Sequence, residues 1–175
     1  IGLAKKVLLA DTLAPYADAG FSSTGDVQFW GAWATALTYA LQLYFDFSGY
    51  SDMALGLARM FGIRFPLNFY SPYKATSIID FWARWHMTLT RYITAYLYYP
   101  VAMAVTRWRI RHGRATGSTA VSTVGGFLSM TVLPTVWAMG LAGIWHGGGL
   151  QSLIFGLLHA AYLAINHAWR VLRGG

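Results

Sequence analysis

Cysteine and glutamate are absent from this sequence of 175 residues, and charged residues are scarce. Without cysteine, these residues can form no disulfide, zinc–thiolate site or thiol nucleophile, and the redox compartment stays open. Only 11% of the residues are charged, whereas a soluble domain typically carries about 25%. No Asp, Glu, Lys or Arg occurs between Ala115 and Trp169. As one helix, that stretch would far exceed a hydrocarbon crossing of about 30 Å, so it must fold back on itself. The composition excludes an ordinary soluble domain.

An initiator methionine and a signal peptide are also missing. The sequence begins with Ile1, and no basic start followed by a small-residue cleavage site is present. We expect these residues to be an internal piece of a larger multi-spanning protein, forming part of one membrane domain over residues 1–175.

Apolar and basic residues dominate instead. The sequence is 56% hydrophobic and 17% aromatic, with a mean hydropathy of +0.43 and a net charge of +7. Its densest basic cluster is residues 107–114, with arginine at 107, 109, 111 and 114. Such a cluster indicates a cytoplasmic membrane loop rather than a nucleic-acid-binding face. A lipid headgroup or partner site is the alternative for these arginines.

The hydrophobic pattern predicts an all-α, polytopic integral membrane helical bundle. Uncharged residues 27–45 are long enough to span a membrane, and residues 64–73, with two prolines, form a loop. A further helix begins near Gly126, with a kink at Pro134. Residues 147–149 are three glycines, which permit the positive φ values that a reversal needs. Residues 151–172 then return as a helix.

Carboxylates mark two further segments. Asp46 and Asp52 follow the first apolar run, either in an interfacial loop where Asp52 pairs with Arg59 or in the wall of a polar pocket. Asp80 lies in a weak capping box that begins at Ser77, and its i, i+4 spacing from Arg84 predicts an ion pair on one helix face. The tryptophans and tyrosines that follow are typical of an aromatic belt at the headgroup level.

Two histidines could carry chemistry. His146 lies within the uncharged run beside the glycine reversal, and His86 lies on the aromatic helix between Arg84 and Arg91. A buried neutral imidazole can remove a proton from a hydroxyl near neutral pH. The alternative for either is a hydrogen-bonded packing histidine. His159 is predicted on a nearly opposite helical face from His146, and His167 at the interface.

Metal or haem ligation is the alternative to proton transfer by these histidines. No HExxH pattern or Cys/His cluster occurs, so we expect no metal site. Paired histidines on different helices could ligate haem, which leaves a non-enzymatic transporter or haem-carrying membrane subunit as the rival function.

Motifs in a fixed order resemble the membrane-bound O-acyltransferase (MBOAT) family, and within it the bacterial alginate O-acetylation branch, itself similar to the teichoic acid D-alanyl transferases. These motifs are Tyr44-Phe45-Asp46-Phe47-Ser48-Gly49-Tyr50-Ser51-Asp52-Met53-Ala54, Phe65-Pro66-Leu67-Asn68-Phe69, Asp80-Phe81-Trp82-Ala83-Arg84-Trp85-His86-Met87-Thr88-Leu89 and Gly143-Ile144-Trp145-His146-Gly147.

The resemblance implies a multi-pass protein of the bacterial inner membrane, with a funnel leading to a buried tunnel. The family's essential histidine corresponds to His146 and its second characteristic histidine to His86. The reaction implied moves an acyl group, with acetyl as the first candidate, from a cytoplasmic thioester to a hydroxyl of an extracytoplasmic polysaccharide or of a periplasmic partner protein. Acetyl-CoA or an acyl carrier would be the co-substrate, with no tightly bound cofactor, and the partners would include membrane lipid but no nucleic acid. Residues expected to position substrate or line the pocket are Asp46, Ser48, Asp52, Asp80, Arg84, Trp85 and Trp145.

Overall fold

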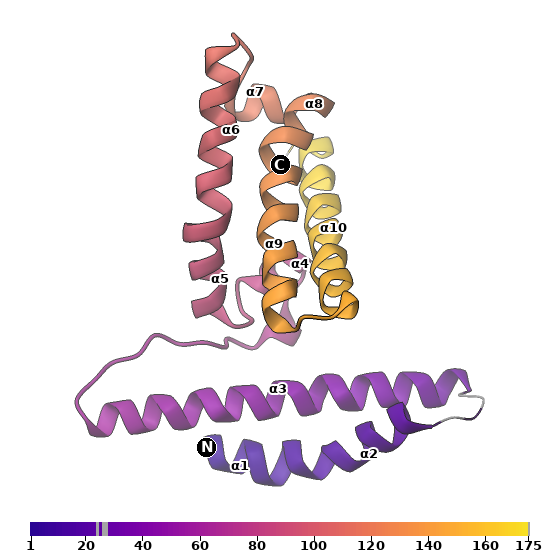
Figure 1. Cartoon of the computed structure of the whole chain (residues 1–175). Helices are drawn as coiled ribbons and strands as arrows, with labels where there is room; N and C mark the ends of the chain where they lie inside the picture. The colour runs from indigo at the N-terminus through magenta and orange to yellow at the C-terminus, as the bar shows by residue number, and fades with distance from the viewer. Residues whose placement is uncertain (24, 26–27, 175) are drawn as a thin grey trace. The chain divides into compact units, whose positions relative to one another are not determined.

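The computed structural model describes residues 1–23, 25 and 28–174, which fold into two compact units, Ile1–Phe69 and Tyr70–Gly175 (Figure 1). The described residues form helices and loops without a strand, which confirms the all-α prediction. Thr24 and Asp26 of the predicted polar loop, and Val27 at the predicted start of the first spanning helix, lie outside the described residues.

The first unit is a pair of antiparallel helical segments. Its N-terminal arm consists of α1 (Gly2–Ala4), the π-helical η1 (Lys5–Ala10) and α2 (Asp11–Ser22), and the arm packs along α3 (Phe29–Met60). The backbones meet at glycines: a Cβ on Gly2 would lie 2.6 Å from the carbonyl oxygen of Gly49. Small residues at this contact allow the closest approach of two helices.

Helix α3 is longer than the sequence pattern predicts. Asp46 and Asp52 lie inside it, not in an interfacial loop, because lysines of η1 neutralise both carboxylates across the helix pair. Lys6 Nζ lies 2.6 Å from Asp46 Oδ1, and Lys5 Nζ lies 2.8 Å from Asp52 Oδ2, in place of the Asp52–Arg59 pair considered from sequence. The helix ends at Met60, and the φ of +75° at Gly62 lets the Ile63 N–H donate to the Ala58 carbonyl.

The loop predicted at residues 64–73 is confirmed apart from its end, where the short 3₁₀ turn η2 (Pro72–Lys74) begins. Two prolines exclude a continuous helix here.

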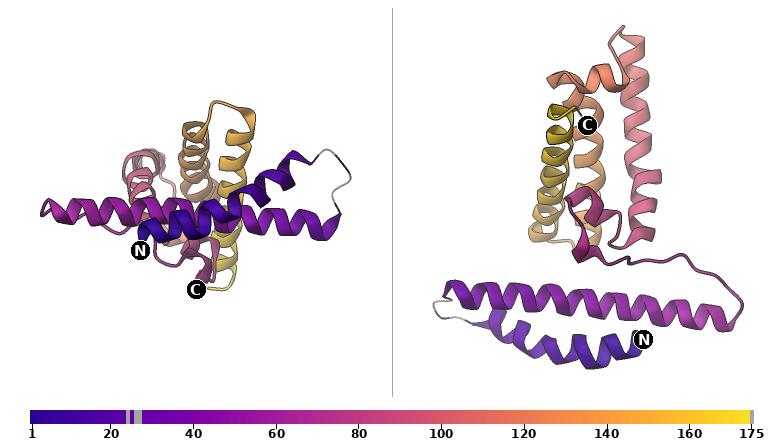
Figure 2. Two further views of the ribbon diagram at one scale, coloured as in Figure 1. Left: turned by 90° about the horizontal axis from the view of Figure 1, so that it is seen from below. Right: turned by 180° about the vertical axis from the view of Figure 1, so that it is seen from behind.

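The second unit consists of long helical columns joined by short elements (Figures 1 and 2). After α4 (Ile78–Trp82), one column is built from α5 (Met87–Ile93), η3 (Thr94–Tyr98) and α6 (Tyr99–Arg111). Beyond α7 (Gly117–Val121), the next is built from α8 (Val124–Phe127), η4 (Leu128–Val132) and α9 (Leu133–His146). The last is α10 (Leu150–Leu172).

One helix in the described part of the chain, Val124–His146, is long and apolar enough to cross a membrane. It begins two residues before the predicted Gly126. Residues 29–45 of the predicted span at 27–45 fall within α3, and residues 151–172 fall within α10; neither helix meets the same criterion. Helix α3 carries Asp46, Asp52 and Arg59, and α10 carries two histidines, an asparagine and Arg170.

Prolines within these columns are preceded by π-helical turns. Segment η4 ends two residues before Pro134, and η3 ends two residues before Pro100. A proline ring clashes with the carbonyl four residues earlier and lacks a donor, and a π turn accommodates both defects. The column from Val124 to His146 therefore continues through Pro134.

Helices α9 and α10 form a hairpin that reverses at residues 147–149, as predicted (Figure 2). The expected reason for the glycines is wrong, because none of them has a left-handed φ and Gly147 is extended at 170°. Space explains Gly147 instead, since a Cβ there would lie 2.6 Å from Ser152 Oγ.

One arginine of residues 107–114 is buried and is therefore more than a solvated topology signal. Arg109 is only 6% exposed, and its guanidinium donates to the Ala115 carbonyl at 2.8 Å and to Ser129 Oγ at 3.0 Å. The other arginines of residues 107–114 are exposed. Arg109 thus ties the end of α6 to η4.

Candidate active site

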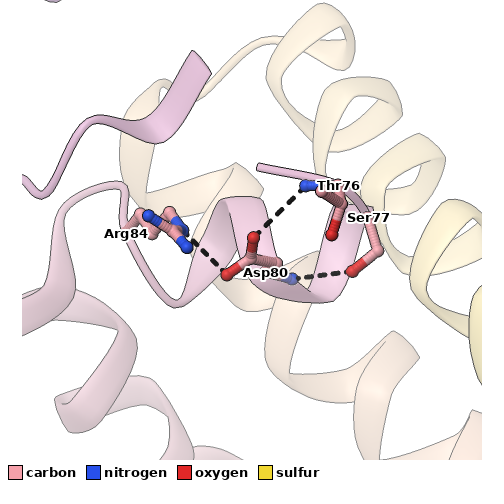
Figure 3. A network of polar contacts seen from close by, with 4 residues as sticks. All are labelled: Thr76, Ser77, Asp80 and Arg84. Carbon is pink, nitrogen blue, oxygen red and sulfur yellow. Dashed lines mark hydrogen bonds and ion pairs between the residues drawn. The ribbon is translucent and has the colours of Figure 1, made fainter. Parts of the chain in front are cut away.

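A sharp corner between α4 and α5 presents the first set of predicted site residues. Ser77 caps α4 by accepting a hydrogen bond from the Asp80 N–H at 3.1 Å, as the capping-box pattern predicts (Figure 3). Asp80 in turn accepts from Arg84 Nε at 2.8 Å and from the Thr76 N–H at 3.2 Å. The hydrogen bond from Arg84 lowers the pKa of Asp80, which keeps the carboxylate ionised. The predicted Asp80–Arg84 pair is confirmed.

The same pair anchors the loop that enters the unit. The guanidinium of Arg84 lies 5.5 Å from the Tyr70 ring centroid, and the Arg84 carbonyl accepts from the Tyr70 N–H at 2.9 Å. Trp85 stacks on Phe81 with ring centroids 5.6 Å apart. Arg84 and Trp85 therefore act in the described residues as packing and bracing groups for the corner.

His86 lies at the apex of the corner. The sequence pattern predicts a continuous helix through this residue, but α4 ends at Trp82 and α5 begins at Met87. His86 adopts φ 44° and ψ 54°, a left-handed conformation uncommon for a residue with a Cβ. The prediction that His86 lies within one aromatic helix between Arg84 and Arg91 is consequently wrong. Strained backbone of this kind is frequent at functional sites.

His146 is the last residue of α9 and lines an apolar cavity of about 410 Å³ between α4, α5, η3, α9 and α10. Aliphatic and aromatic groups make up most of the wall. The remaining side chains of the wall carry a hydroxyl, indole or imidazole group: Trp82, Thr90, Thr94, Tyr98, Thr135, His146 and His167. An apolar cavity with a few polar groups is the usual form of a small-molecule site.

The two predicted catalytic histidines are brought together electrostatically. Burial lowers the pKa of His86, and repulsion from His146 lowers it further. His86 is half-buried, whereas His146 is exposed within the described residues. Neutral imidazole, the form that accepts a proton, is favoured at His86.

Trp145 lies beside the histidine and not in the main cavity. It is 67% exposed, and its ring centroid lies 4.8 Å from that of His146. It lines a neighbouring cavity of about 400 Å³ with residues of α5, η3 and α9. Trp145 can thus restrict the rotation of the His146 ring.

The predicted pocket residues of the first unit lie at the contact between its two helical segments. Asp46 and Asp52 are occupied by Lys6 and Lys5, and Lys6 also pairs with Asp11 at 2.7 Å. Hydrogen bonds from Asp11 and Asp46 raise the pKa of Lys6. Ser48 is buried at 1% exposure, and its hydroxyl has no hydrogen-bond partner among the described residues. The carboxylates therefore serve helix pairing here.

Several residues of the site were not singled out from the sequence. His167, expected at the interface, lines the main cavity. His159 is enclosed by aromatic rings, with centroids 4.4 Å from Phe155, 5.1 Å from Trp82 and 5.9 Å from Tyr162. Gly156 and Ala160 of α10 are spaced i, i+4, as are the cavity-lining residues Leu163 and His167. This spacing could have indicated which face of α10 packs against the other helices. No group of three or more His, Cys, Asp or Glu side chains is placed to hold a metal ion in the described ranges.

An all-α unit that places His146 on the wall of an apolar cavity, with His86 within electrostatic reach of it, fits a class of enzymes acting on ligands with apolar portions. Residues 1–119 match the MBOAT, membrane-bound O-acyltransferase family. The chain belongs to this family.

Relatives extend the similarity past His146. The chain is 43% identical over 169 residues to a peptidoglycan O-acetyltransferase of Helicobacter pylori, covering 97% of this chain and 28% of that protein. It is 42% identical over 174 residues to a probable alginate O-acetylase AlgI of Azotobacter vinelandii, covering 97% and 30%. It is 34% identical over 125 residues to a teichoic acid D-alanyltransferase of Bacillus subtilis, covering 71% and 28%. The chain therefore spans less than a third of the length of these relatives.

Proposed function

We propose that the complete protein is a multi-pass O-acyltransferase of the bacterial inner membrane. It would move an acyl group, with acetyl as the first candidate, from a cytoplasmic thioester to a hydroxyl of an extracytoplasmic polysaccharide or of a periplasmic partner protein. The observation that carries the proposal is the position of His146 on the wall of an apolar cavity, with His86 electrostatically coupled to it. The names of the three relatives, which denote O-acetylation of peptidoglycan or alginate and D-alanyl transfer to teichoic acid, support the substrate class.

Direct transfer is the mechanism that these residues support. His146 acts as general base and removes the proton of the acceptor hydroxyl while that oxygen attacks the thioester carbonyl carbon. The new C–O bond forms, the C–S bond breaks, and the leaving thiolate takes the proton from the imidazolium. General-base catalysis of this kind typically contributes about 10² to 10⁴-fold. These residues contain no cysteine, and the sequence around Ser48, Ser51 and Ser152 does not indicate a serine nucleophile with its own base.

The donor would be acetyl-CoA or an acyl carrier thioester, bound as a co-substrate. The cavity of about 410 Å³ lies within the usual range for small-molecule sites, and its apolar wall suits an acyl group and its linker. The α4–α5 corner, with Asp80, Arg84, Trp85 and His86, would position the substrate beside the cavity. Trp145 would restrict the rotation of the His146 ring.

Histidine variants of the full-length protein in proteoliposomes test this function. His146→Gln should lose at least about 10²-fold in kcat with a labelled acyl thioester, while donor binding persists. His112→Gln is the matched control, because His112 is exposed at the end of α6 and bonds only locally to the Trp108 carbonyl at 2.8 Å. A labelled acyl adduct trapped on the protein without acceptor would rule out direct transfer. A Soret absorption band that disappears in His146→Gln would support the haem-carrying alternative instead.

A further inference from the structure

The α4–α5 corner holds His86 in a conformation that a residue with a Cβ avoids, so other contacts must stabilise it. A left-handed conformation is unfavourable for such a residue, and it persists where the surrounding structure over-determines it. The end of α4 also leaves carbonyls without a helical partner. A group that satisfies these carbonyls would fix the corner and hence the direction in which His86 leaves it.

Thr90 is that group. Its hydroxyl donates to the carbonyl of Trp82, the last residue of α4, at 3.1 Å. The same hydroxyl lies 3.4 Å from the carbonyl of Trp85, the residue immediately before His86. Its backbone N–H donates to the His86 carbonyl at 3.0 Å. One residue in the first turn of α5 therefore contacts the corner both before and at the strained residue.

Thr90 also lines the cavity that His146 lines. It lies on the inner side of the corner, whereas the ion pair of Asp80 and Arg84 holds the other arm through Thr76 and Tyr70. We infer that Thr90 is a positioning residue, whose hydroxyl sets the orientation of His86 relative to His146 during acyl transfer. This inference rests on the proposed function.

Valine and serine substitutions separate positioning from packing. Thr90→Val keeps the shape and removes the hydroxyl, so the Trp82 carbonyl loses the hydrogen bond from Thr90. Thr90→Ser keeps the donor and removes only a methyl group. Thr106→Val is the control for the chemical change itself, because the Thr106 hydroxyl bonds within α6 to the Ala102 carbonyl at 2.8 Å, away from the cavity.

Acyl transfer by the full-length protein in proteoliposomes is the first measurement. Thr90→Val should lower kcat by at least about tenfold, with KM for the thioester donor nearly unchanged, because small misplacements of a catalytic group are costly. Thr90→Ser should restore kcat to near the wild-type value, and Thr106→Val should equal the wild type. Wild-type kcat in Thr90→Val, or a Thr90→Ser variant as slow as Thr90→Val, would overturn the inference.

The pKa of His86, followed by NMR of labelled histidine, is a second measurement that needs no activity. His146 on α9 is the titratable group that acts on His86, so release of the corner in Thr90→Val should raise the His86 pKa toward its ordinary value, and Thr90→Ser should not. An unchanged His86 pKa in Thr90→Val contradicts the positioning role. If His146→Gln is fully active while Thr90→Val still moves the His86 pKa, the proposed function fails and the structural coupling stands.

Discussion

Gly143 of α9 and Gly156 of α10 meet backbone to backbone. A Cβ built on Gly143 would lie 3.0 Å from Gly156 Cα and would clash with the Ser152 carbonyl oxygen. A Cβ built on Gly156 would lie 3.0 Å from Gly143 Cα and would clash with the Met139 carbonyl oxygen. The neighbours on both sides are backbone atoms, which cannot rotate away, so this contact sets the distance between the two helices.

Gly156→Ala should therefore destabilise the protein, although alanine is the better helix former. Overpacking of a close contact typically costs about 1–3 kcal/mol, which exceeds the gain in helix propensity of about 1 kcal/mol. Thermal unfolding of the full-length protein in detergent measures the effect. Gly125→Ala is the control, because Gly125 is also helical and a Cβ there meets nothing within 4 Å. Equal melting temperatures for the two variants would show that the helices can separate without cost.

The pKa of His86 should respond to substitution of His146. Burial is the larger cause of its depression below 6.5 and repulsion from His146 the smaller, so His146→Gln should raise the pKa only part of the way. Histidine NMR titration of the full-length protein provides the measurement, with His112→Gln as the control. A His86 pKa that does not move would mean that the two imidazoles are independent in the complete protein.

The depressed pKa of His86 also predicts acid sensitivity. In the unfolded chain His86 takes up a proton near pH 6.5, whereas in the folded protein it does so only at lower pH. Its contribution to stability is thus fully present above about pH 6.5 and is lost as the pH falls toward the folded pKa. Unfolding at pH 7.5 and pH 5.5 should show a smaller pH dependence for His86→Gln than for the wild type. The same dependence in both proteins would contradict this assignment.

Arg109→Met should destabilise the end of the α6 column. The substitution leaves Ser129 and the Ala115 carbonyl without their charged donor, and loss of a partner for a buried polar group costs about 1–3 kcal/mol. Arg111→Met, at an exposed position of the same helix, should have little effect. Protease accessibility of residues 112–123 and the melting temperature report the difference. A melting temperature that matches Arg111→Met would show that Arg109 is only a topology signal.

Single cysteines can test the membrane topology, because these residues contain none of their own. Any cysteine elsewhere in the full-length protein would first be replaced. Arg111→Cys should react with an impermeant thiol reagent only in inverted vesicles, and Gly148→Cys only from the outside of spheroplasts. Position 113 is less suitable, since Gly113 has a φ of +62° that cysteine would strain. Labelling of Arg111→Cys from outside would reverse the proposed orientation.

Local patterns predicted the elements whose causes are local. The loop at residues 64–73 follows from its prolines, the Asp80–Arg84 pair from its spacing, and the helix near Gly126 from an uninterrupted apolar run. His86 and His146 were selected from the sequence as a pair, and the structure places them within electrostatic reach of each other. Their catalytic roles stay a prediction.

The sequence-based predictions are wrong where a contact with a residue distant in the chain decides the local structure. Asp46 and Asp52 resemble loop residues until Lys5 and Lys6, some forty residues away in the chain, neutralise them and allow α3 to continue. Helical periodicity through residues 81–86 gave no sign of the corner, at which the Thr90 hydroxyl donates to the Trp82 carbonyl. His167 looked interfacial because its place on the cavity wall depends on how α10 packs.

The π-helical turn at η4 makes the column from Val124 to His146 sensitive to the number of its residues. A π turn accommodates one residue more than an α-helix would in the same length. Deleting one residue between Leu128 and Val132 would let the column close into regular α-helix and would leave everything beyond it near its present orientation. Deleting one residue within the regular α-helix α9 would instead turn His146 by about 100° relative to Val124 and would carry it off the cavity wall. In this helix the count of residues, and not only their identity, is therefore part of the site.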